Sequence, residues 1–411
     1  MVDLNRERRI LILGNGFDLA HGLPTRYSDF LDFCNIVMSY IKDGELSNDE
    51  LQAFFTKIDG FKWPEFIKSK VKDEYNNSGS ILRKIKRELE NNIWYKFFYK
   101  PRLNIRSINN NWVDFENEIR RVIEFADRKN IGLDEICSHL LNEYHKQNQN
   151  KDAGQIDGFK LNLFGNVTEE CFDKNYLSNV TVGELRKYWY DHLENFIKAF
   201  NLYLAHFVDS ISAEEIKNFA GVENIISRIE KIKPDYVLNF NYTHTYEKLY
   251  PKTKVFHIHG ECKQDPDKNN IVLGIDQYWQ TEEERQEHVN YAIFKKYVQR
   301  IRKRTGNKHR TMLNYLRVFV APNVGRLLAP KAYVFGHSLN KTDKDILADF
   351  FNLEIESAGM KEDINITVFY HDKETEGELI ANMVSLIGEE KVLEKSDKSR
   401  LRFIKLEELN I

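Results

Sequence analysis

The alternation of short apolar runs with helical segments after Pro234 constrains the fold of this chain more than any other feature. Runs rich in β-branched and aromatic residues occur at 236–240, 254–258, 271–275, 332–335 and 364–370 and are typical of strands. Helical segments are expected between several of them, for instance at 282–304 and 343–358. Alternation of strand and helix predicts βαβ units and a mostly parallel sheet.

An apolar run near the start of the chain, at residues 9–13, is expected to join the same sheet. It ends abruptly in a glycine-bearing turn, and a helix is predicted over 27–40. The following segment, 41–230, is mainly helical in character. We therefore expect an α/β protein whose sheet-bearing core is formed by residues 1–40 and 231–411, with 41–230 as a large, mainly helical insertion.

One apolar helix face is predicted inside this insertion. Its residues recur at helical spacing: Trp189, Leu193, Phe196, Ile197, Phe200 and Leu204. Such a face packs either within the domain or across a dimer, and we expect the chain to form a homo-oligomer. The segment 148–181, rich in Asn, Gly and Asp, is expected to contain a long loop.

The composition favours a cytoplasmic protein without a membrane partner. The N-terminus is charged and lacks the apolar region of a signal peptide, and no run approaches the ~18 apolar residues that cross a bilayer. The four cysteines, Cys34, Cys137, Cys171 and Cys262, are far apart in the sequence. This spacing excludes a thiolate zinc site of the Cys-x-x-Cys type and argues against a disulfide framework.

The turn after the first strand is able to bind an anion. One glycine, Gly14, tolerates a tight turn, a second, Gly16, lets the backbone approach closely, and the next helix directs its N-terminus at a phosphate. Asp18 lies in the first helical turn, where a carboxylate repels phosphate but supports the start of the helix. A phosphate site and a purely structural turn both remain open.

Polar turns also follow three of the other predicted strands. They contain Asn239, Asn241 and Thr243, then His257 and His259, and finally Gly336, Ser338 and Asp343. In an open parallel sheet, ligands bind at the carboxyl ends of the strands. Taken singly, each turn has a structural alternative, such as capping asparagines or a hydrogen-bonded core histidine. Together the four turns form a constellation of polar groups at one sheet edge.

Two histidines two residues apart, His257 and His259, are half of a metal site. No nearby Cys, Asp or third His completes a recognisable ligand set, so we predict no metal. A single histidine that accepts a proton at a strand end is the more economical interpretation.

Two segments resemble those of a known family. The residues at 12–25, Ile-Leu-Gly-Asn-Gly-Phe-Asp-Leu-Ala-His-Gly-Leu-Pro-Thr, are similar to the opening signature of the AbiH proteins of bacteriophage abortive infection. The residues at 112–116, Trp-Val-Asp-Phe-Glu, resemble another recurring AbiH segment.

The order of motifs is also similar to that of the wider SIR2-like superfamily. The turn at 14–18 resembles its Gly-Ala-Gly-x-Ser turn, 22–24 its Gly-Ile-Pro, and 240–243 its asparagine-containing segment. Further on, His259 and Gly260 resemble its catalytic His-Gly, 276–278 its Asp-Tyr pair, and 336–339 its Gly-x-Ser-Leu turn. This resemblance implies a Rossmann-like (SIR2-like) parallel core and, since the four-cysteine zinc module of the deacetylases is missing, hydrolysis of NAD rather than deacylation.

The resemblance also implies roles for individual residues. NAD is the substrate and no cofactor is bound permanently; Asn241 and His259 are the catalytic residues. The residues expected to bind the nucleotide are Gly14, Asn15, Gly16, Asp18, Pro24, Thr243, Gly336, Ser338 and Asp343. Among these, Gly14 to Gly16 are assigned to the pyrophosphate, and Ser338 and Asp343 to the adenosine ribose.

Two of these positions depart from the SIR2-like pattern. Asp18 replaces the usual Ser, and Thr243 replaces the usual Asp. A third departure is Arg26, which lies one place away from the arginine of the deacetylases. An alternative function is therefore a nucleotide-sensing binding protein whose catalysis is altered or lost.

The charge distribution suggests a further partner. From His288 through Thr342 the chain has no Asp or Glu but twelve Lys or Arg, eight of them within 295–310. Such a segment fits a nucleic-acid or phage-derived polyanionic trigger, or a nucleic-acid-acting effector. The alternative is that it complements acidic surface of the insertion or of a neighbouring subunit.

Overall fold

The computed structural model describes residues 7–105, 115–129, 182–276, 281, 283, 291–317 and 328–408, apart from 43, 45, 220, 306–307 and 358–359. No helix in these ranges is both long and apolar enough to cross a bilayer. The loop expected at 148–181 and the cysteines Cys137 and Cys171 lie outside them.

A six-stranded, all-parallel sheet forms the centre of the fold. Its strands are β1 (Arg9–Leu13), β2 (Tyr236–Asn239), β3 (Lys254–His257), β4 (Lys331–Phe335), β7 (Asn365–Tyr370) and β8 (Leu401–Lys405). They follow one another across the sheet as β3-β2-β1-β4-β7-β8, the order of a doubly wound sheet. The α/β class with a mostly parallel sheet is therefore confirmed.

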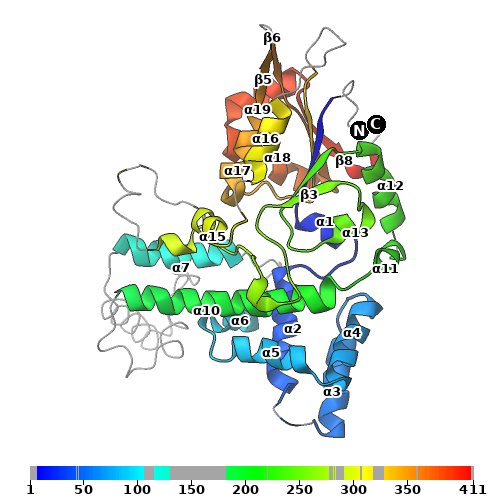
Figure 1. The fold of residues 1–411 in the computed structure, drawn as a ribbon, viewed down its shortest axis with the longest axis vertical. Coiled ribbons are helices and arrows are strands. Elements are labelled where there is room, and N and C mark those ends of the chain that lie inside the picture. Colours follow the sequence, from blue (N-terminus) through cyan, green and yellow to red (C-terminus); the bar gives the residue numbers. More distant parts are fainter. Residues whose placement is uncertain are drawn as a thin grey trace, which may run out of the picture.

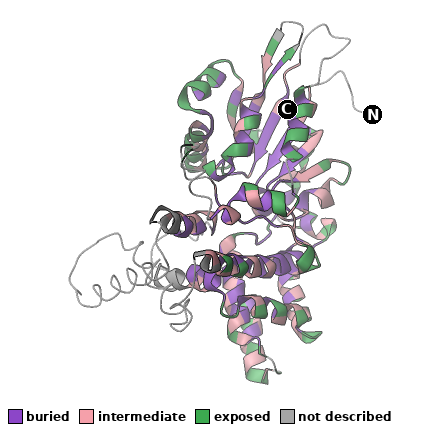
Figure 2. Ribbon diagram, turned by 60° about the vertical axis from the view of Figure 1, so that its left-hand side comes forward, coloured by how far each residue is buried: buried purple, intermediate pink, exposed green. Residues whose placement is uncertain are grey.

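The sheet is covered by helices on both faces (Figures 1 and 2). On one face, Ile10 and Ile12 of β1 pack with α16 (Lys308–Arg317), α17 (Lys344–Phe351), α18 (Lys373–Ile387) and α19 (Glu389–Asp397). On the other face, Leu11 and Leu13 pack with α1 (Asn15–Ala20), α12 (Val222–Ile232) and α13 (Thr245–Leu249). Because both faces are buried, the strands are continuous apolar runs instead of alternating ones.

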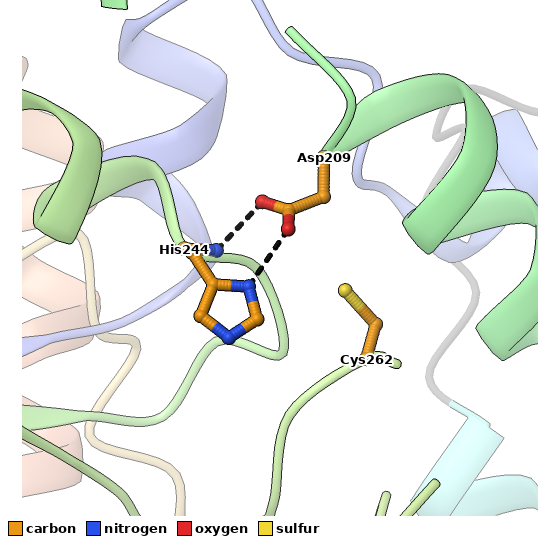
Figure 3. Close-up of side chains that lie close together, drawn as sticks. All are labelled: Asp209, His244 and Cys262. Atoms are coloured by element: carbon orange, nitrogen blue, oxygen red, sulfur yellow. Dashed lines mark hydrogen bonds and ion pairs between the residues drawn. The ribbon is translucent and has the colours of Figure 1, made fainter. Parts of the chain in front are cut away.

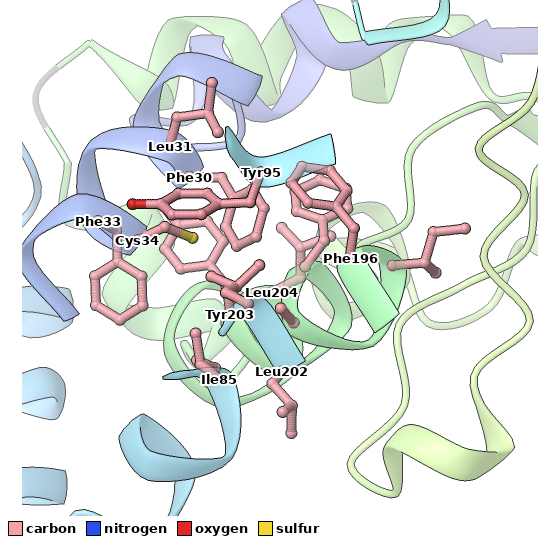
Figure 4. Packing of buried hydrophobic residues seen from close by; sticks show 14 of the residues in the cluster. Phe30, Leu31, Phe33, Cys34, Ile85, Tyr95, Phe196, Leu202, Tyr203 and Leu204 are labelled. Atoms are coloured by element: carbon pink, nitrogen blue, oxygen red, sulfur yellow. The ribbon is translucent and has the colours of Figure 1, made fainter. Parts of the chain in front are cut away.

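Between β1 and β2 the described chain is helical and has a separate apolar core (Figure 4). Its helices are α2 (Tyr27–Tyr40), α3 (Asn48–Asp59), α4 (Glu65–Asn76), α5 (Ser80–Leu89), α6 (Ile93–Ile105), α7 (Phe115–Lys129), α10 (Val182–Tyr203), the π-helix η2 (Leu204–Val208) and α11 (Ala213–Lys217). The apolar face predicted on 189–204 contacts this core, where Phe196 and Phe200 pack against Phe30. That face therefore packs within the chain.

One prediction after β3 is wrong. The run at 271–275 forms no strand; it has only an isolated bridge from Ile275 to Lys295, and Ile271 and Leu273 are buried in the helical core. Its side chains are apolar for that reason. The helical segment predicted at 282–304 is described only in part, and that part contains the 3-10 turn η4 (Ala292–Phe294) and α15 (Lys296–Arg302).

Elements near the C-terminus complete the described fold. The sequence did not predict β8 or the antiparallel hairpin of β5 (Glu354–Ser357) and β6 (Met360–Asp363). Short 3-10 turns are η3 (Pro266–Lys268), η5 (Lys341–Asp343) and η6 (Leu406–Glu408). The helix predicted over 343–358 ends at Phe351, and the first strand of this hairpin starts at Glu354.

Glycines allow the turns after β1 and β4 to touch through their backbones. Gly336 has a φ of 68°, and a Cβ there would lie 2.4 Å from the Phe17 nitrogen. A Cβ on Gly14 or Gly16 would lie 2.5 or 2.6 Å from the Cα of His337 or Gly336. The Gly14 and Gly16 N–H groups donate to the carbonyl groups of Phe335 (3.1 Å) and Gly336 (2.8 Å).

We predict that Gly336→Ala destabilises the protein by about 3 kcal/mol, since it adds left-handed strain to a backbone overlap. Gly377→Ala is a matched control, because Gly377 is in α18 and no atom lies within 4 Å of a Cβ there; it should be neutral or stabilising by up to about 1 kcal/mol. Urea denaturation measures both. Equal effects of the two substitutions would contradict the tight contact between the turns.

Candidate active site

The ends of four neighbouring strands are level with one another. Leu13, the last residue of β1, pairs with Asn239 of β2 and with Phe335 of β4, and Asn239 pairs with His257 of β3. The four polar turns predicted from the sequence therefore start at one edge of the sheet. In doubly wound sheets the ligand crevice opens at this edge, where the strand order reverses between the two halves; here that point lies between β1 and β4.

The β2 turn is tied to the β1 turn by its asparagines. The Asn241 side-chain amide donates to the Gly14 carbonyl (3.0 Å), and its backbone N–H donates to the Asn239 side chain (3.0 Å). Asn239 in turn donates to the Thr243 carbonyl (3.3 Å). Both asparagines are buried, and these bonds hold Asn241 against the β1 turn.

The two residues that depart from the SIR2-like pattern are hydrogen-bonded to each other. The Thr243 hydroxyl donates to a carboxylate oxygen of Asp18 at 2.5 Å, and both side chains are buried. The Asp18 carboxylate therefore turns toward β2. Burial raises the pKa of Asp18 to about 6, although hydrogen bonds from Thr243 and Thr245 oppose the shift.

A buried charged cluster surrounds His259 at the end of β3. The Nε2 of His259 lies 2.8 Å from one oxygen of Asp343, and the Nε2 of His337 lies 3.5 Å from the other. Lys296 of α15 bridges that carboxylate (2.8 Å) to Glu116 of α7 (2.7 Å). The ring of Phe240 packs edge-on against both histidines. Five side chains from separate segments thus form one cluster: Asp343 is at its centre, and His259, His337, Lys296 and Glu116 surround it.

This environment keeps His259 neutral at physiological pH. Burial is the largest cause and, with the charge of Lys296, lowers the pKa of His259 to about 4, against the opposing effect of Asp343. The pKa of Asp343 lies well below its usual value because Lys296 and His259 overcome the effect of burial. A carboxylate only accepts, so the Nε2 of His259 carries the proton. Its Nδ1 is buried without a hydrogen-bond partner in the described part of the chain.

The other predicted nucleotide-binding residues differ in their exposure and in their hydrogen-bond partners. The Asn15 side chain accepts from Thr25 (2.6 Å), and the Pro24 carbonyl accepts from the Tyr203 hydroxyl (2.7 Å). Ser338 is exposed and its carbonyl accepts from Asn382 (2.8 Å). The N–H groups of Gly14 and Gly16 are engaged within the protein, as described above. Asp343, predicted to lie beside a ribose, contacts His259, His337 and Lys296.

A glycine turn directs His259 and Glu261 into different clusters. Gly260 has a φ of 81°, and a Cβ there would lie 2.0 Å from the Asn270 carbonyl oxygen. After this turn, Glu261 accepts from His244 at 2.8 Å. The pairing of His257 with His259 as metal ligands is not formed, since His259 faces Asp343.

His257 instead lies in a second group of potential ligands. Single ligand atoms of His244, His257 and Glu261 lie within 4.8 Å of one another, as do those of Asp209, His244 and Cys262 (Figure 3). Burial lowers the pKa of His244, but hydrogen bonds with Asp209, Cys262 and Glu261 raise it to about 12 overall. Sequence spacing gave no reason to combine these residues.

Part of the basic segment is buried in ion pairs. Lys303 pairs with Glu194 of α10 (2.9 Å), and Arg300 pairs with Asp345. With Lys296, at least three of the eight basic residues at 295–310 thus have acidic partners, and two of these partners lie in the helical region between β1 and β2. For these residues the segment complements the chain's own acidic groups. Arg302, Arg304, Lys308 and Arg310 are exposed.

Lys296, Glu116 and His337 were not identified as site residues from the sequence. Lys296 belonged to a basic run and Glu116 to an acidic one, and neither run indicated which member is buried. Asp114, the neighbouring acid in the same motif, lies outside the described residues.

We predict that Asp18 makes the free energy of unfolding fall as pH rises from about 4 to about 6. In this window the unfolded chain releases the proton that the folded protein retains, and above it the loss is constant. Each tenfold change in proton affinity is ~1.4 kcal/mol, so the loss approaches about 3 kcal/mol. Asp18→Asn should remove this dependence in urea titrations at several pH values. Parallel pH profiles of the variant and the natural protein would contradict it.

A comparison with protein families gives one match. The family model for bacteriophage abortive infection AbiH matches residues 10–370, which include β1, the helical region and the strand ends described above. No curated protein and no solved structure matches the chain. The family implies a function in phage abortive infection. The match spans most of the chain, and the protein belongs to the AbiH family.

Proposed function

We propose that this protein hydrolyses NAD to nicotinamide and ADP-ribose, with His259 as the general base and Asn241 as the residue that orients the attacking group. The observation that carries the proposal is the state of His259: its Nε2–H is held by Asp343, and its Nδ1 is buried with no partner among the described residues. A carboxylate that fixes one ring nitrogen leaves the other as a proton acceptor.

The reaction breaks the bond between the ribose anomeric carbon and the nicotinamide nitrogen, and the bonding electron pair leaves with nicotinamide. The oxygen of water then bonds to the anomeric carbon, which has oxocarbenium character, while its proton passes to Nδ1 of His259 and on to solvent. The Asn241 amide positions the water or a ribose hydroxyl. No metal takes part in these steps.

The proposed nucleotide site lies where the β1 and β4 turns meet. Because Asn241 and His259 are buried, binding has to open the contact between these turns. The pyrophosphate is then assigned to Asn15 and the other atoms of the 14–16 turn, and a ribose to the exposed Ser338. Asp343 acts through His259 in this scheme.

The Asp18–Thr243 bond favours catalysis over its loss. The SIR2-like pattern has a hydroxyl at the first position and a carboxylate at the second, and this chain has the reverse. The exchange still leaves one hydroxyl and one carboxylate at the two positions, and in this chain they are hydrogen-bonded. The departures that suggested a nucleotide-sensing protein are therefore compatible with an intact site.

We predict that His259→Ala lowers NAD turnover by ~10²–10⁴-fold, as expected for removal of a general base, and that Asn241→Ala also abolishes it. Released nicotinamide and ADP-ribose are separated by chromatography, and circular dichroism checks the fold. His371→Ala is the control, since His371 is exposed and its partners among the described residues are the neighbouring Asp372 and Thr375. Turnover at the natural rate by folded His259→Ala would eliminate the mechanism. NAD binding without any turnover by the natural protein would favour the sensor.

The same assignment predicts an unusual pH profile. The pKa of His259 is lowered to about 4, so the base is already neutral at pH 5. The acid limb of kcat/KM, which reports groups of the free enzyme, should lie near pH 4 and not near the ordinary histidine value of about 6.5. An acid limb at 6 to 7 would show that a different, more exposed base acts.

A further inference from the structure

The second cluster at the sheet edge has the features of a metal site. It joins three segments: His244 precedes α13, His257 ends β3, and Glu261 follows the Gly260 turn. Two imidazoles and a carboxylate are a ligand set that binds Zn²⁺ and related first-row ions. Neither the family nor the proposed reaction assigns a role to this cluster.

Both histidines are oriented as metal-binding histidines are. The Nδ1–H of His244 donates to Asp209 (2.7 Å), and the Nδ1–H of His257 donates to the Asn241 carbonyl (3.0 Å). A carboxylate or a backbone carbonyl on one ring nitrogen fixes the tautomer that presents the other nitrogen to a metal. In each ring, that other nitrogen is Nε2.

Each Nε2 faces a carboxylate oxygen. His244 Nε2 lies 2.8 Å from Glu261, and His257 Nε2 lies 2.6 Å from Glu247. The centroids of the two rings lie 5.1 Å apart. One divalent cation between the rings would bind both Nε2 atoms and be neutralised by the carboxylates.

Hydrogen bonds to α10 and η2 fix the loop that follows Glu261. Asn201 of α10 bonds both the N–H and the carbonyl of Lys263 at 2.8 Å, and Gln264 donates to the Ala205 carbonyl of the π-helix η2 at 2.8 Å. Asp209 follows η2 directly. The loop is thus anchored before any ligand binds, and such preorganisation lowers the entropic cost of binding.

We propose that His244, His257 and Glu261 bind a Zn²⁺ ion through both Nε2 atoms and the Glu261 carboxylate, with Glu247 beside it as the candidate fourth ligand. The alternative group, Asp209 with His244 and Cys262, is disfavoured because Lys248 already neutralises Asp209 at 2.9 Å. Lys263 pairs with the other oxygen of Glu261, but this lysine is 38% exposed and free to swing away.

The test is zinc binding by the full-length protein, measured by titration calorimetry after dialysis against EDTA, together with elemental analysis. One Zn²⁺ per chain is expected. His257→Ala and Glu261→Gln should weaken binding at least 100-fold, and Asp209→Asn, which removes only the orienting carboxylate, ~10–100-fold. Cys262→Ser and the exposed control His371→Ala should bind zinc as the natural protein does.

A second measurement uses the natural protein alone, in case a variant does not fold. Co²⁺ should give the visible bands of a nitrogen and oxygen site without the ultraviolet charge-transfer band of a cobalt–thiolate bond. The proposal is overturned if the natural protein binds no zinc, if Cys262→Ser abolishes binding, or if the thiolate band appears. These readouts need no NAD, so they are independent of the outcome for His259.

Discussion

The carboxylate of Asp343 is the interaction on which the arrangement of the site depends. It is buried and contacts two histidines from the ends of β3 and β4, together with Lys296. Through Lys296 it reaches Glu116 of α7, and so connects the sheet with the helical region. A buried charge left without its partner costs about 3–5 kcal/mol, so each member of the cluster holds the others in place. The orientation of the His259 ring therefore depends on the whole cluster.

The parallel sheet could be predicted because buried strands are continuous apolar runs between turns. Five of the six strands were found in this way, and glycine-bearing turns indicated the ends of β1, β3 and β4. The same signal failed at 271–275, because an apolar run that packs on a helical core has the same composition as a strand. The strand β8 was missed since Arg402 and Lys405 interrupt its apolar residues at the edge of the sheet.

Only those residues of the candidate site that lie just after a strand could be predicted from the sequence. Asn241 and His259 follow β2 and β3 directly, and the level register of these strands brings them to one edge. The charged partners could not be found in this way, since Glu116 and Lys296 lie 180 residues apart in the sequence. Pairing across such a distance is a property of the fold. Composition counted both charges as surface residues, although both are largely buried.

The segment from His257 to Cys262 connects the two polar clusters, because it contributes residues to both. Gly260 reverses the chain so that His259 faces Asp343 while Glu261 faces His244, and its backbone leaves no space for a side chain beside Asn270. His257 meanwhile holds the carbonyl of Asn241. The two clusters therefore share the Gly260 turn and, through His257, a hydrogen bond to Asn241. Any coupling that results is reciprocal, because two binding equilibria that share one element affect each other by the same factor.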